Sequence, residues 1–303
     1  MGTPDFATTS LQALVENGYH VVGAITVPDK PAGRGQKLRS SSVKEYALSQ
    51  NIKVLQPSNL KDETFLSELK ALQADVQVVV AFRMLPEAVW NMPKHGTFNL
   101  HGSLLPKYRG AAPINWAVMN GDTETGVTTF FIECQIDTGN IIFQEKVNIE
   151  DNDNAGVIHD KLMHIGSTLV CKTIDAITNN TAPNNKQEGE ATQATKIFKD
   201  TCQIDWSADI NSIHNHIRGL SPYPAAWTTL HTGKALKIYS SAKETTQHQK
   251  ATGSILTDGK SYFKVAVSDG FIQLLEVQLA GKKRMAITDF LRGFQTTENL
   301  SVK

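Results

Sequence analysis

The stretch FNLHGSLLPKYRGAAP, residues 98–113, begins as a short strand and continues as a loop. In a strand alternate side chains share a face, so Asn99 and His101 are predicted to point to the same side. An amide can donate a hydrogen bond to a carbonyl oxygen that gains negative charge, and an imidazole can polarise that carbonyl or shuttle a proton. Regular helix or strand is excluded in the rest of the stretch by four residues, Gly102, Pro106, Gly110 and Pro113. We therefore expect chemistry on a shaped loop at this strand end.

A carboxylate follows the next predicted strand. Residues 123–126 open an apolar run at 127–132, and the IDTG sequence at 136–139 predicts a tight turn that carries Asp137. An amide, an imidazole and a carboxylate from neighbouring strands can form a proton relay around an acyl centre. Each residue also has a structural alternative: Asn99 as a satisfied polar group, His101 as a core histidine, and Asp137 as the start of an Asx turn. Taken one residue at a time, these structural alternatives are favoured.

Length and composition set broad limits on the protein. A chain of 303 residues exceeds the usual size of one domain and predicts two. Its 40% hydrophobic and 20% charged residues are typical of a globular protein, and its net charge of zero means that any RNA contact must come from local clusters. Three widely spaced cysteines, Cys134, Cys171 and Cys202, argue against a disulfide framework and against a zinc site. No apolar run reaches the roughly 20 residues that span a bilayer, so we expect a cytoplasmic protein without a membrane partner.

Strands alternate with helices up to about residue 150. The predicted strands are 20–27, 53–55 and 75–82, and the predicted helices are 8–17, 43–50 and 62–72. This alternation predicts an α/β domain with a mostly parallel sheet, a hairpin-like pair at 126–133 and 140–148, and a long helix at 155–177. A glycine turn that enters a helix normally follows a central strand, so we expect the first strand of this sheet to be missing.

A basic segment at residues 28–42 interrupts this pattern. Its glycines and prolines exclude a stable helix or strand. Its cations are Lys30, Arg34, Lys37 and Arg39, against the single acid Asp29. Composition alone favours a solvated surface loop, since basic loops are common.

The second half of the chain differs in character from the first. Residues 179–195 are polar and predict a linker, which divides the chain into 1–178, 179–195 and 196–303. A helix at 210–218 then precedes five short predicted strands, at 227–230, 236–240, 253–256, 263–267 and 271–279. This spacing predicts a small β-barrel. A basic triplet in this part, Lys282, Lys283 and Arg284, reads equally well as an RNA contact or as a solvated charge run.

Taken together, the segments resemble the 10-formyltetrahydrofolate-dependent formyltransferases. The order Asn99-x-His101, then SLLP, then IDTG is similar to the signature of that family, and SLLPKYRGAAPINWA at 103–117 is the most specific part. Further matching segments are GTPDFA at 2–7, PDKPAGRGQKL at 28–38, IDWS at 204–207, IRGLSPYPAAW at 217–227 and GKKRM at 281–285. The resemblance covers nearly the whole chain and points to those members that formylate initiator methionyl-tRNA.

The resemblance implies a fold and an activity. A Rossmann-like catalytic domain, whose first strand lies upstream of Met1, is expected to precede an OB-like, tRNA-binding β-barrel. The implied reaction transfers the formyl group of 10-formyltetrahydrofolate to the α-amine of the acceptor tRNA, without a metal. Asn99 and His101 would hydrogen-bond the formyl oxygen as it gains charge, while Asp137 would orient and charge His101 and assist proton movement.

The resemblance also implies binding residues and a monomeric enzyme. The implied folate-binding residues are Arg83, Met84, Leu85, Ser103, Leu104, Leu105, Pro106, Ile136, Thr138 and Gly139. The implied tRNA-binding residues are Arg34, Lys37, Arg39, Lys282, Lys283 and Arg284. Among them Arg34 occupies the position of the key arginine in a loop that contacts the tRNA acceptor arm, where its fork suits phosphates and base edges.

Three alternative functions remain open from the sequence. A formyltransferase for a nucleotide sugar or small amine would share the three catalytic residues, as would a formyltetrahydrofolate hydrolase. Neither needs the basic segment around Arg34. A non-catalytic OB-type RNA-binding protein would explain the basic C-terminal residues, but not three convergent polar groups on a separate α/β domain.

Overall fold

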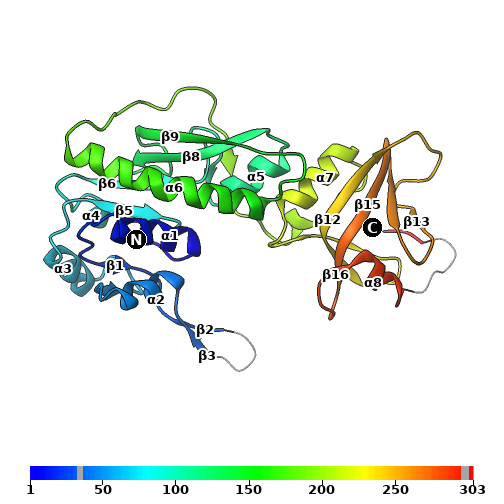
Figure 1. Ribbon diagram of the computed structural model, residues 1–303, viewed down its shortest axis with the longest axis horizontal. Coiled ribbons are helices and arrows are strands. Elements are labelled where there is room, and N and C mark those ends of the chain that lie inside the picture. Colours follow the sequence, from blue (N-terminus) through cyan, green and yellow to red (C-terminus); the bar gives the residue numbers. More distant parts are fainter. Residues whose placement is uncertain (33–36, 295–299, 303) are drawn as a thin grey trace. The chain divides into compact units, whose positions relative to one another are not determined.

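The computed structural model describes residues 1–32, 37–294 and 300–302. They form two compact units whose segments alternate along the chain (Figure 1). Unit one comprises residues 1–110, 126–147 and 159–193, and unit two comprises residues 111–125, 148–158 and 194–303. The three-part division that the sequence suggests stays a prediction.

The sheet of unit one is mixed. Its four-stranded part has the order β5 (Gln77–Val80), β6 (Thr97–His101), β8 (Glu124–Phe131) and β9 (Ile141–Asn148), with β6 parallel to β5 and antiparallel to β8. A parallel pair, β1 (Ala24–Ile25) and β4 (Val54–Leu55), forms a separate ribbon. Residues 1–2 join the two parts, because the Gly2 N–H donates to the Ile25 carbonyl at 3.0 Å and the Val80 N–H donates to the Met1 carbonyl at 2.9 Å. The predicted α/β class is confirmed.

Amphipathic helices accompany these strands. They are α1 (Asp5–Glu16), α2 (Ser42–Ser49), α3 (Glu63–Ala71), the short α4 (Glu87–Trp90) and the long α6 (Ala155–Thr178). Side-chain caps define two of their starts, since Ser41 accepts from the Lys44 N–H and Asp62 accepts from the Phe65 N–H. Except for α4, which the sequence did not predict, these helices confirm the periodicity-based predictions to within a few residues.

Two predictions for the first 42 residues are wrong. The strand expected at 20–27 is limited to Ala24–Ile25. The basic segment, in which the glycines and prolines were predicted to exclude a strand, contains an antiparallel pair, β2 (Lys30–Ala32) and β3 (Lys37–Arg39). Pro31 is tolerated there because each strand of a two-stranded ribbon is an edge, where a missing N–H costs no ladder bond on the open side.

Unit two contains a closed antiparallel barrel. Its strands are β11 (Ala226–Thr229), β12 (Ala235–Thr245), β13 (Ile255–Thr257), β14 (Phe263–Val267), β15 (Gly270–Leu279) and β16 (Met285–Ala286). They pair in the order β11-β12-β15-β14-β13, with β16 on β15. Residues 300–302 close the sheet, because Val302 bridges to Leu230 after β11 and Ser301 bridges to Ser254 before β13. The predicted barrel is confirmed, with its core built from fully buried side chains such as Ile238, Phe263 and Leu274.

The predicted strand at 236–240 is too short. In the structure β12 continues to Thr245, and its register with β15 shifts on either side of Ser240. A bulge of this kind breaks the alternation of buried and exposed residues. The alternating sequence pattern therefore stops at the bulge, although the strand continues beyond it. The sequence also missed β16, the 3₁₀ turn at Asp200–Cys202, and the helix α8 (Ile287–Leu291), which contacts β16.

Two segments that precede residue 159, at 111–125 and 148–158, pack within unit two. Helix α5 (Pro113–Met119) contacts α7 (Ile210–Gly219), and the Asn115 amide donates to the Gly219 carbonyl at 2.7 Å. The buried guanidinium of Arg218 donates to the carbonyls of Glu150 and Asp153, at 3.3 and 2.9 Å. Side-chain bonds to backbone carbonyls thus hold residues 111–125 and 148–158 against α7.

Gly219→Ala is expected to destabilise this packing. A Cβ atom at Gly219 would lie 2.4 Å from Cγ and 2.7 Å from the backbone nitrogen of Met119, so α5 would have to shift. We expect the free energy of unfolding in urea to fall by about 1–3 kcal/mol. Gly293→Ala is the matched control, because its nearest atom is the Phe290 carbonyl oxygen at 4.0 Å. Equal effects of the two substitutions would contradict the tight α5–α7 contact.

Candidate active site

Strand β6 carries both polar residues that the sequence singled out. Its central position, between parallel β5 and antiparallel β8, places Asn99 opposite Phe130 and His101 opposite Thr128. The alternate residues Phe98 and Leu100 are buried in the core, whereas the Asn99 side chain is half-buried. Within the described part of the chain the Asn99 amide has no hydrogen-bond partner, so its two N–H groups remain available as donors.

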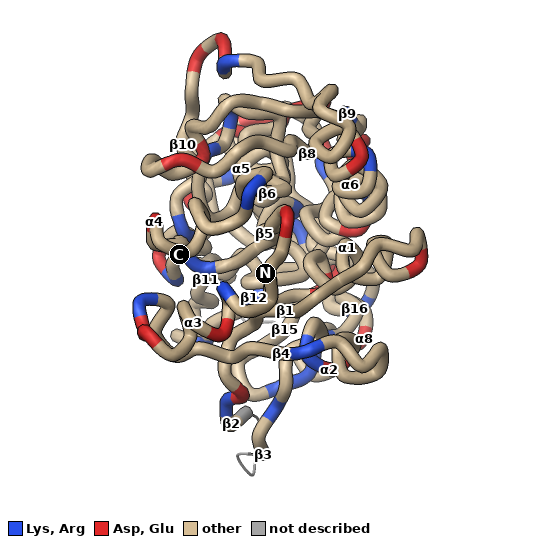
Figure 2. Tube along the Cα trace, turned by 90° about the vertical axis from the view of Figure 1, so that its left-hand side faces the viewer, with Lys and Arg blue, Asp and Glu red and all other residues tan. Residues whose placement is uncertain are grey.

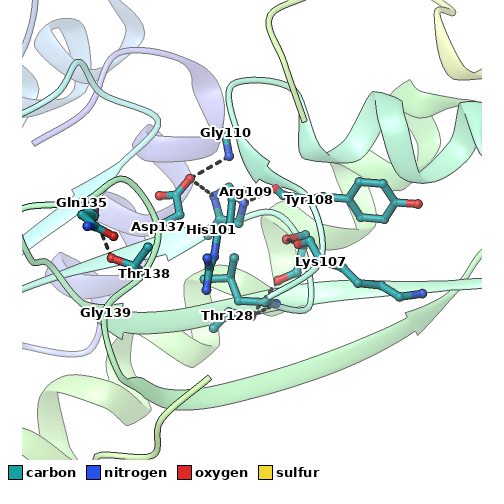
Figure 3. A network of polar contacts seen from close by, with 12 residues as sticks. His101, Lys107, Tyr108, Arg109, Gly110, Thr128, Gln135, Asp137, Thr138 and Gly139 are labelled. Carbon is teal, nitrogen blue, oxygen red and sulfur yellow. Dashed lines mark hydrogen bonds and ion pairs between the residues drawn. The ribbon is translucent and has the colours of Figure 1, made fainter. Parts of the chain in front are cut away.

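The imidazole of His101 is held by a backbone carbonyl. Its Nε2 lies 2.8 Å from the Tyr108 oxygen (Figure 3). Because a carbonyl only accepts, Nε2 carries the proton. In the neutral ring Nδ1 is then an acceptor, and it faces the Asp137 carboxylate at 3.8 Å, which is too long for a hydrogen bond. The ring is 6% exposed and meets Phe130 edge to face.

The Asp137 carboxylate is fixed by a different partner. Its Oδ2 accepts from the Gly110 N–H at 2.8 Å, across 27 residues of sequence (Figure 3). An Asx turn would direct the carboxylate to its own turn, so that alternative is wrong for Asp137. The residue adopts a left-handed conformation with φ of +55°, which Asp tolerates better than most residues.

The route of the chain to Asp137 differs from the simplest expectation. Strand β8 runs antiparallel to β6, so Phe131 at its end lies opposite Phe98 and not opposite His101. The loop after β8 folds back from there and brings Asp137 to the imidazole. Gly139 makes this return possible, because a Cβ atom at this position would lie 1.7 Å from the Phe131 carbonyl oxygen.

Side-chain hydrogen bonds fix the backbone of the SLLP loop after β6. Thr128 accepts from the Leu105 N–H at 3.1 Å and donates to the Ser103 carbonyl at 2.7 Å. The Ser103 hydroxyl donates to the Lys107 carbonyl at 2.6 Å. The prediction that this loop excludes regular structure is wrong at Arg109–Gly110, which form the two-residue strand β7. Helix α5 begins at Pro113 as its first helical residue.

Three loops contain the predicted folate-binding residues. Residues 83–85 follow β5, 103–106 follow β6, and 136–139 follow β8. Leu85 and Leu105 are buried, whereas Met84 and Ile136 are 67% and 59% exposed. The Arg83 guanidinium donates to the carbonyls of Pro57 and Ser58, which fixes the loop after β5.

The predicted tRNA-binding residues lie on two separate segments. Arg34 lies outside the described residues, Lys37 belongs to β3, and the exposed Arg39 ends that strand. Figure 2 shows Lys and Arg positions along β2 and β3. Lys282 and Lys283 are exposed between β15 and β16.

Arg284 is less available than the other cations of its triplet. Its Nε donates to Glu276 at 2.6 Å, its guanidinium stacks 4.3 Å from the Tyr239 ring, and the bond to Glu276 raises its pKa. The pairing with Glu276 offsets much of its positive charge.

Sequence reasoning missed two residues of the 179–195 segment that contact the site. The Gln187 amide donates to the carbonyls of Asp137 and Gly139, and Thr192 accepts from the Tyr108 N–H. A polar, apolar-poor stretch gives no periodic signal, and single polar residues within it cannot be distinguished from solvated ones.

Neither a metal centre nor a spanning helix was found in the part of the chain that the structure describes. No group of three or more His, Cys, Asp or Glu side chains there has an arrangement that could hold a metal ion. None of the described helices is long and apolar enough to cross a membrane.

Comparison with protein families and individual relatives gives consistent results. A formyl transferase family model matches residues 1–174, and a model of the formyl transferase C-terminal domain matches residues 196–295. A methionyl-tRNA formyltransferase of Bacteroides thetaiotaomicron is 58% identical and aligns over 98% of this chain and 95% of its own. A protein of the same name from Phocaeicola vulgatus is 60% identical over 100% of this chain and 97% of its own.

Solved structures share the fold. An N-formyltransferase from Helicobacter canadensis, in complex with folinic acid and dTDP-3-aminofucose, aligns with a TM-score of 0.66 at 24% identity, over 94% of this chain and 97% of that one. HypX from Aquifex aeolicus, in complex with tetrahydrofolic acid, aligns with a TM-score of 0.59 at 15% identity, over 84% of this chain and 47% of that one. At these identities the likeness supports the fold.

The tautomer of His101 provides a direct test of the site geometry. Nitrogen NMR of histidine-labelled protein in mildly alkaline buffer should show His101 with its proton on Nε2, because the Tyr108 carbonyl accepts it. The resonances of His101 are assigned by their absence in a His101→Asn variant. A proton on Nδ1 would contradict the described arrangement.

Proposed function

Because this chain belongs to the formyl transferase family, we propose that it transfers the formyl group of 10-formyltetrahydrofolate to the α-amino group of initiator methionyl-tRNA. The observation that carries this proposal is identity of 58–60% to methionyl-tRNA formyltransferases over nearly the full length of both chains. The site supports the same chemistry, since it presents an amide donor, an imidazole and a carboxylate on neighbouring elements.

The proposed catalytic roles depend on which side-chain groups already have a hydrogen-bond partner within the protein. Asn99 has uncommitted N–H donors, so it would bind the formyl oxygen as negative charge develops there. His101 donates its Nε2 proton to Tyr108 and keeps an accepting Nδ1 toward Asp137. This favours His101 and Asp137 as a pair that takes the proton from the attacking amine, rather than His101 as a second oxyanion donor.

The reaction balances without a covalent intermediate on the protein. A carbon–nitrogen bond forms between the formyl carbon and the amine, and the bond from that carbon to the folate nitrogen breaks. The His101–Asp137 pair would return the proton to the folate nitrogen that leaves. No charged group of the protein then changes its state over the whole cycle.

Residues on the three loops fit a folate. Met84 and Ile136 each expose a large apolar side chain on the loops after β5 and β8, which suits contact with a flat aromatic ring. The bonds from Thr128 and Ser103 fix the backbone of residues 103–107, so this loop would meet the folate in a preformed shape. We propose residues 83–85, 103–106, 136, 138 and 139 as the folate-binding set.

The basic segment supports a tRNA acceptor. The strands β2 and β3, which pair Lys30 with Arg39, project from the rest of unit one (Figure 1). A projecting basic ribbon suits a clamp on a phosphate backbone, and a small acceptor would not need one. We propose that Arg34, Lys37, Arg39, Lys282 and Lys283 contact the tRNA, with Arg284 contributing less. We further propose a monomeric enzyme that acts in the cytoplasm, where charged initiator tRNA is found.

An assay of tetrahydrofolate release, with separate titrations of RNA and folate binding, separates this function from a hydrolase and from a non-catalytic RNA-binding protein. The protein is incubated with 10-formyltetrahydrofolate and charged initiator methionyl-tRNA, with charged elongator methionyl-tRNA or no tRNA as controls, and tetrahydrofolate release is followed. We expect release with initiator tRNA alone. Release without tRNA would indicate a hydrolase, and RNA binding without folate binding would indicate a non-catalytic protein.

Asn99→Ala is expected to lower kcat by about 100- to 1,000-fold, because it removes the proposed oxyanion donor. The free energy of unfolding in urea should remain near that of the wild type, since the amide makes no bond among the described residues. Asn152→Ala, at an exposed loop position, is the matched control and should retain full activity. Wild-type turnover in Asn99→Ala would refute the assigned role.

Arg34→Ala is expected to raise KM for the tRNA by about tenfold and to reduce the slope of log affinity against log salt by about one. Affinity for the folate should not change, because the proposed contact is to the acceptor. Lys61→Ala, at an exposed position before α3, serves as the control for loss of a surface charge. An unchanged KM for tRNA would exclude Arg34 from acceptor binding.

A further inference from the structure

The 179–195 segment is attached to unit one at several defined points. Asn185 exchanges two backbone hydrogen bonds with Ile141 at the start of β9, at 2.7 and 3.0 Å. Seven residues later the Thr192 carbonyl accepts from the Arg109 N–H at 2.9 Å. Between these anchors the flanking side chains of Lys186 and Glu188 are exposed, but Gln187 is half-buried. Residues 179–195 therefore make specific contacts, although their composition is typical of a flexible linker.

Gln187 uses its complete hydrogen-bonding capacity. Its Nε2 donates to the carbonyls of Asp137 and Gly139, each at 2.9 Å. Its Oε1 accepts from Nε and Nη2 of Arg109, at 3.2 and 2.6 Å. Carbonyls only accept and a guanidinium only donates, so the amide orientation is determined by its partners. Gln187 thereby fixes both sides of the turn on which the Asp137 carboxylate sits and joins that turn to the loop after β6.

Thr192 fixes the backbone of Tyr108, which in turn bonds to His101. Its hydroxyl accepts from the Tyr108 N–H at 2.8 Å, and the carbonyl of the same Tyr108 accepts the Nε2 proton of His101. Tyr108 has φ of +62°, a conformation that bulky side chains rarely adopt and that persists only when its surroundings hold it. The bond from Thr192 thus stabilises the peptide that sets the His101 tautomer.

We propose that Gln187 and Thr192 are positioning residues for the formyl transfer, with Gln187 acting through Asp137 and Thr192 acting through His101. The inference rests on the proposed function for its catalytic meaning. Neither side chain bonds to the three proposed catalytic side chains, and each bonds to the backbone that carries or orients one of them.

The strongest test uses substitutions that preserve shape. Gln187→Glu keeps the acceptor for Arg109 but replaces the two donated bonds with a carboxylate that faces two carbonyls. We expect kcat to fall by about 10- to 100-fold, because small misplacements of catalytic groups have effects of that size, with each KM changed by less than about threefold. Gln193→Glu is the matched control, since Gln193 is exposed, carries the same charge change and makes no side-chain bond in the described structure.

Thr192 allows a rescue experiment. Thr192→Val removes the hydroxyl that accepts from Tyr108 and should lower kcat by about tenfold, while Thr192→Ser retains the hydroxyl and should stay close to wild type. Nitrogen NMR should also show a changed His101 environment in Thr192→Val only. Equal activities of the valine and serine variants would overturn the role of Thr192.

A double-mutant cycle distinguishes positioning from a general structural effect. In single-turnover assays Gln187→Glu should lower the rate in the wild-type background, but by less than about threefold in an Asp137→Asn background, because its effect passes through that carboxylate. The same loss in both backgrounds would overturn the proposal.

A substrate-independent measurement keeps this inference separate from the proposed function. The Gly110 N–H is bonded to Asp137, so Gln187→Glu should speed its hydrogen exchange by at least about tenfold, and Gln193→Glu should not. Unchanged exchange would overturn the proposal. If the wild-type enzyme does not formylate initiator tRNA, the proposed function is refuted. The hydrogen exchange of Gly110 would still show whether Gln187 positions the turn that carries Asp137.

Discussion

The hydrogen bond from the Gly110 N–H to the Asp137 carboxylate, at 2.8 Å, is the contact on which the candidate active site depends. Only 13% of the Asp137 side chain is exposed, and a polar group with so little access to water needs a fixed hydrogen-bond partner. A backbone N–H supplies one without adding a competing charge. The same Oδ2 atom that accepts this bond lies 3.8 Å from His101 Nδ1. The carboxylate therefore faces the imidazole without a hydrogen bond to it. In the proposed mechanism, the attacking amine would pass its proton to this pair.

Two strained residues lie on the loops that this bond joins. Tyr108 and Asp137 are both left-handed, and such conformations typically cost about 1–3 kcal/mol each. Both are stabilised from one segment, through the hydroxyl of Thr192 and the amide of Gln187. The polar character of residues 179–195 thus has a structural cause. A stretch that contributes little to the apolar core contributes instead the donors and acceptors that strained backbone requires.

Patterns in the sequence predicted the features that depend on local order. Periodicity located the helices α1, α2, α3, α6 and α7 and the long strands, and the turn residues of IDTG located Asp137. Features that depend on distant contacts were not accessible. The bulge at Ser240, the pairing of β2 with β3 and the closure by residues 300–302 are decided by partners elsewhere in the chain. The roles proposed for Asn99 and His101 rest on the hydrogen bond between His101 Nε2 and the Tyr108 carbonyl, a contact that the sequence does not predict.

The alternation of the two units along the sequence has a consequence for folding during synthesis. Unit one draws on residues up to 193, and residues 111–125 and 148–158 belong to the unit whose main part begins at residue 194. The bond between Asn115 and Gly219, for example, spans 104 residues. A nascent chain must therefore carry α5 past the ribosome exit long before α7 exists to cover it. Contacts so distant in sequence slow folding, and apolar surface exposed in the interval is where chaperones would engage this chain.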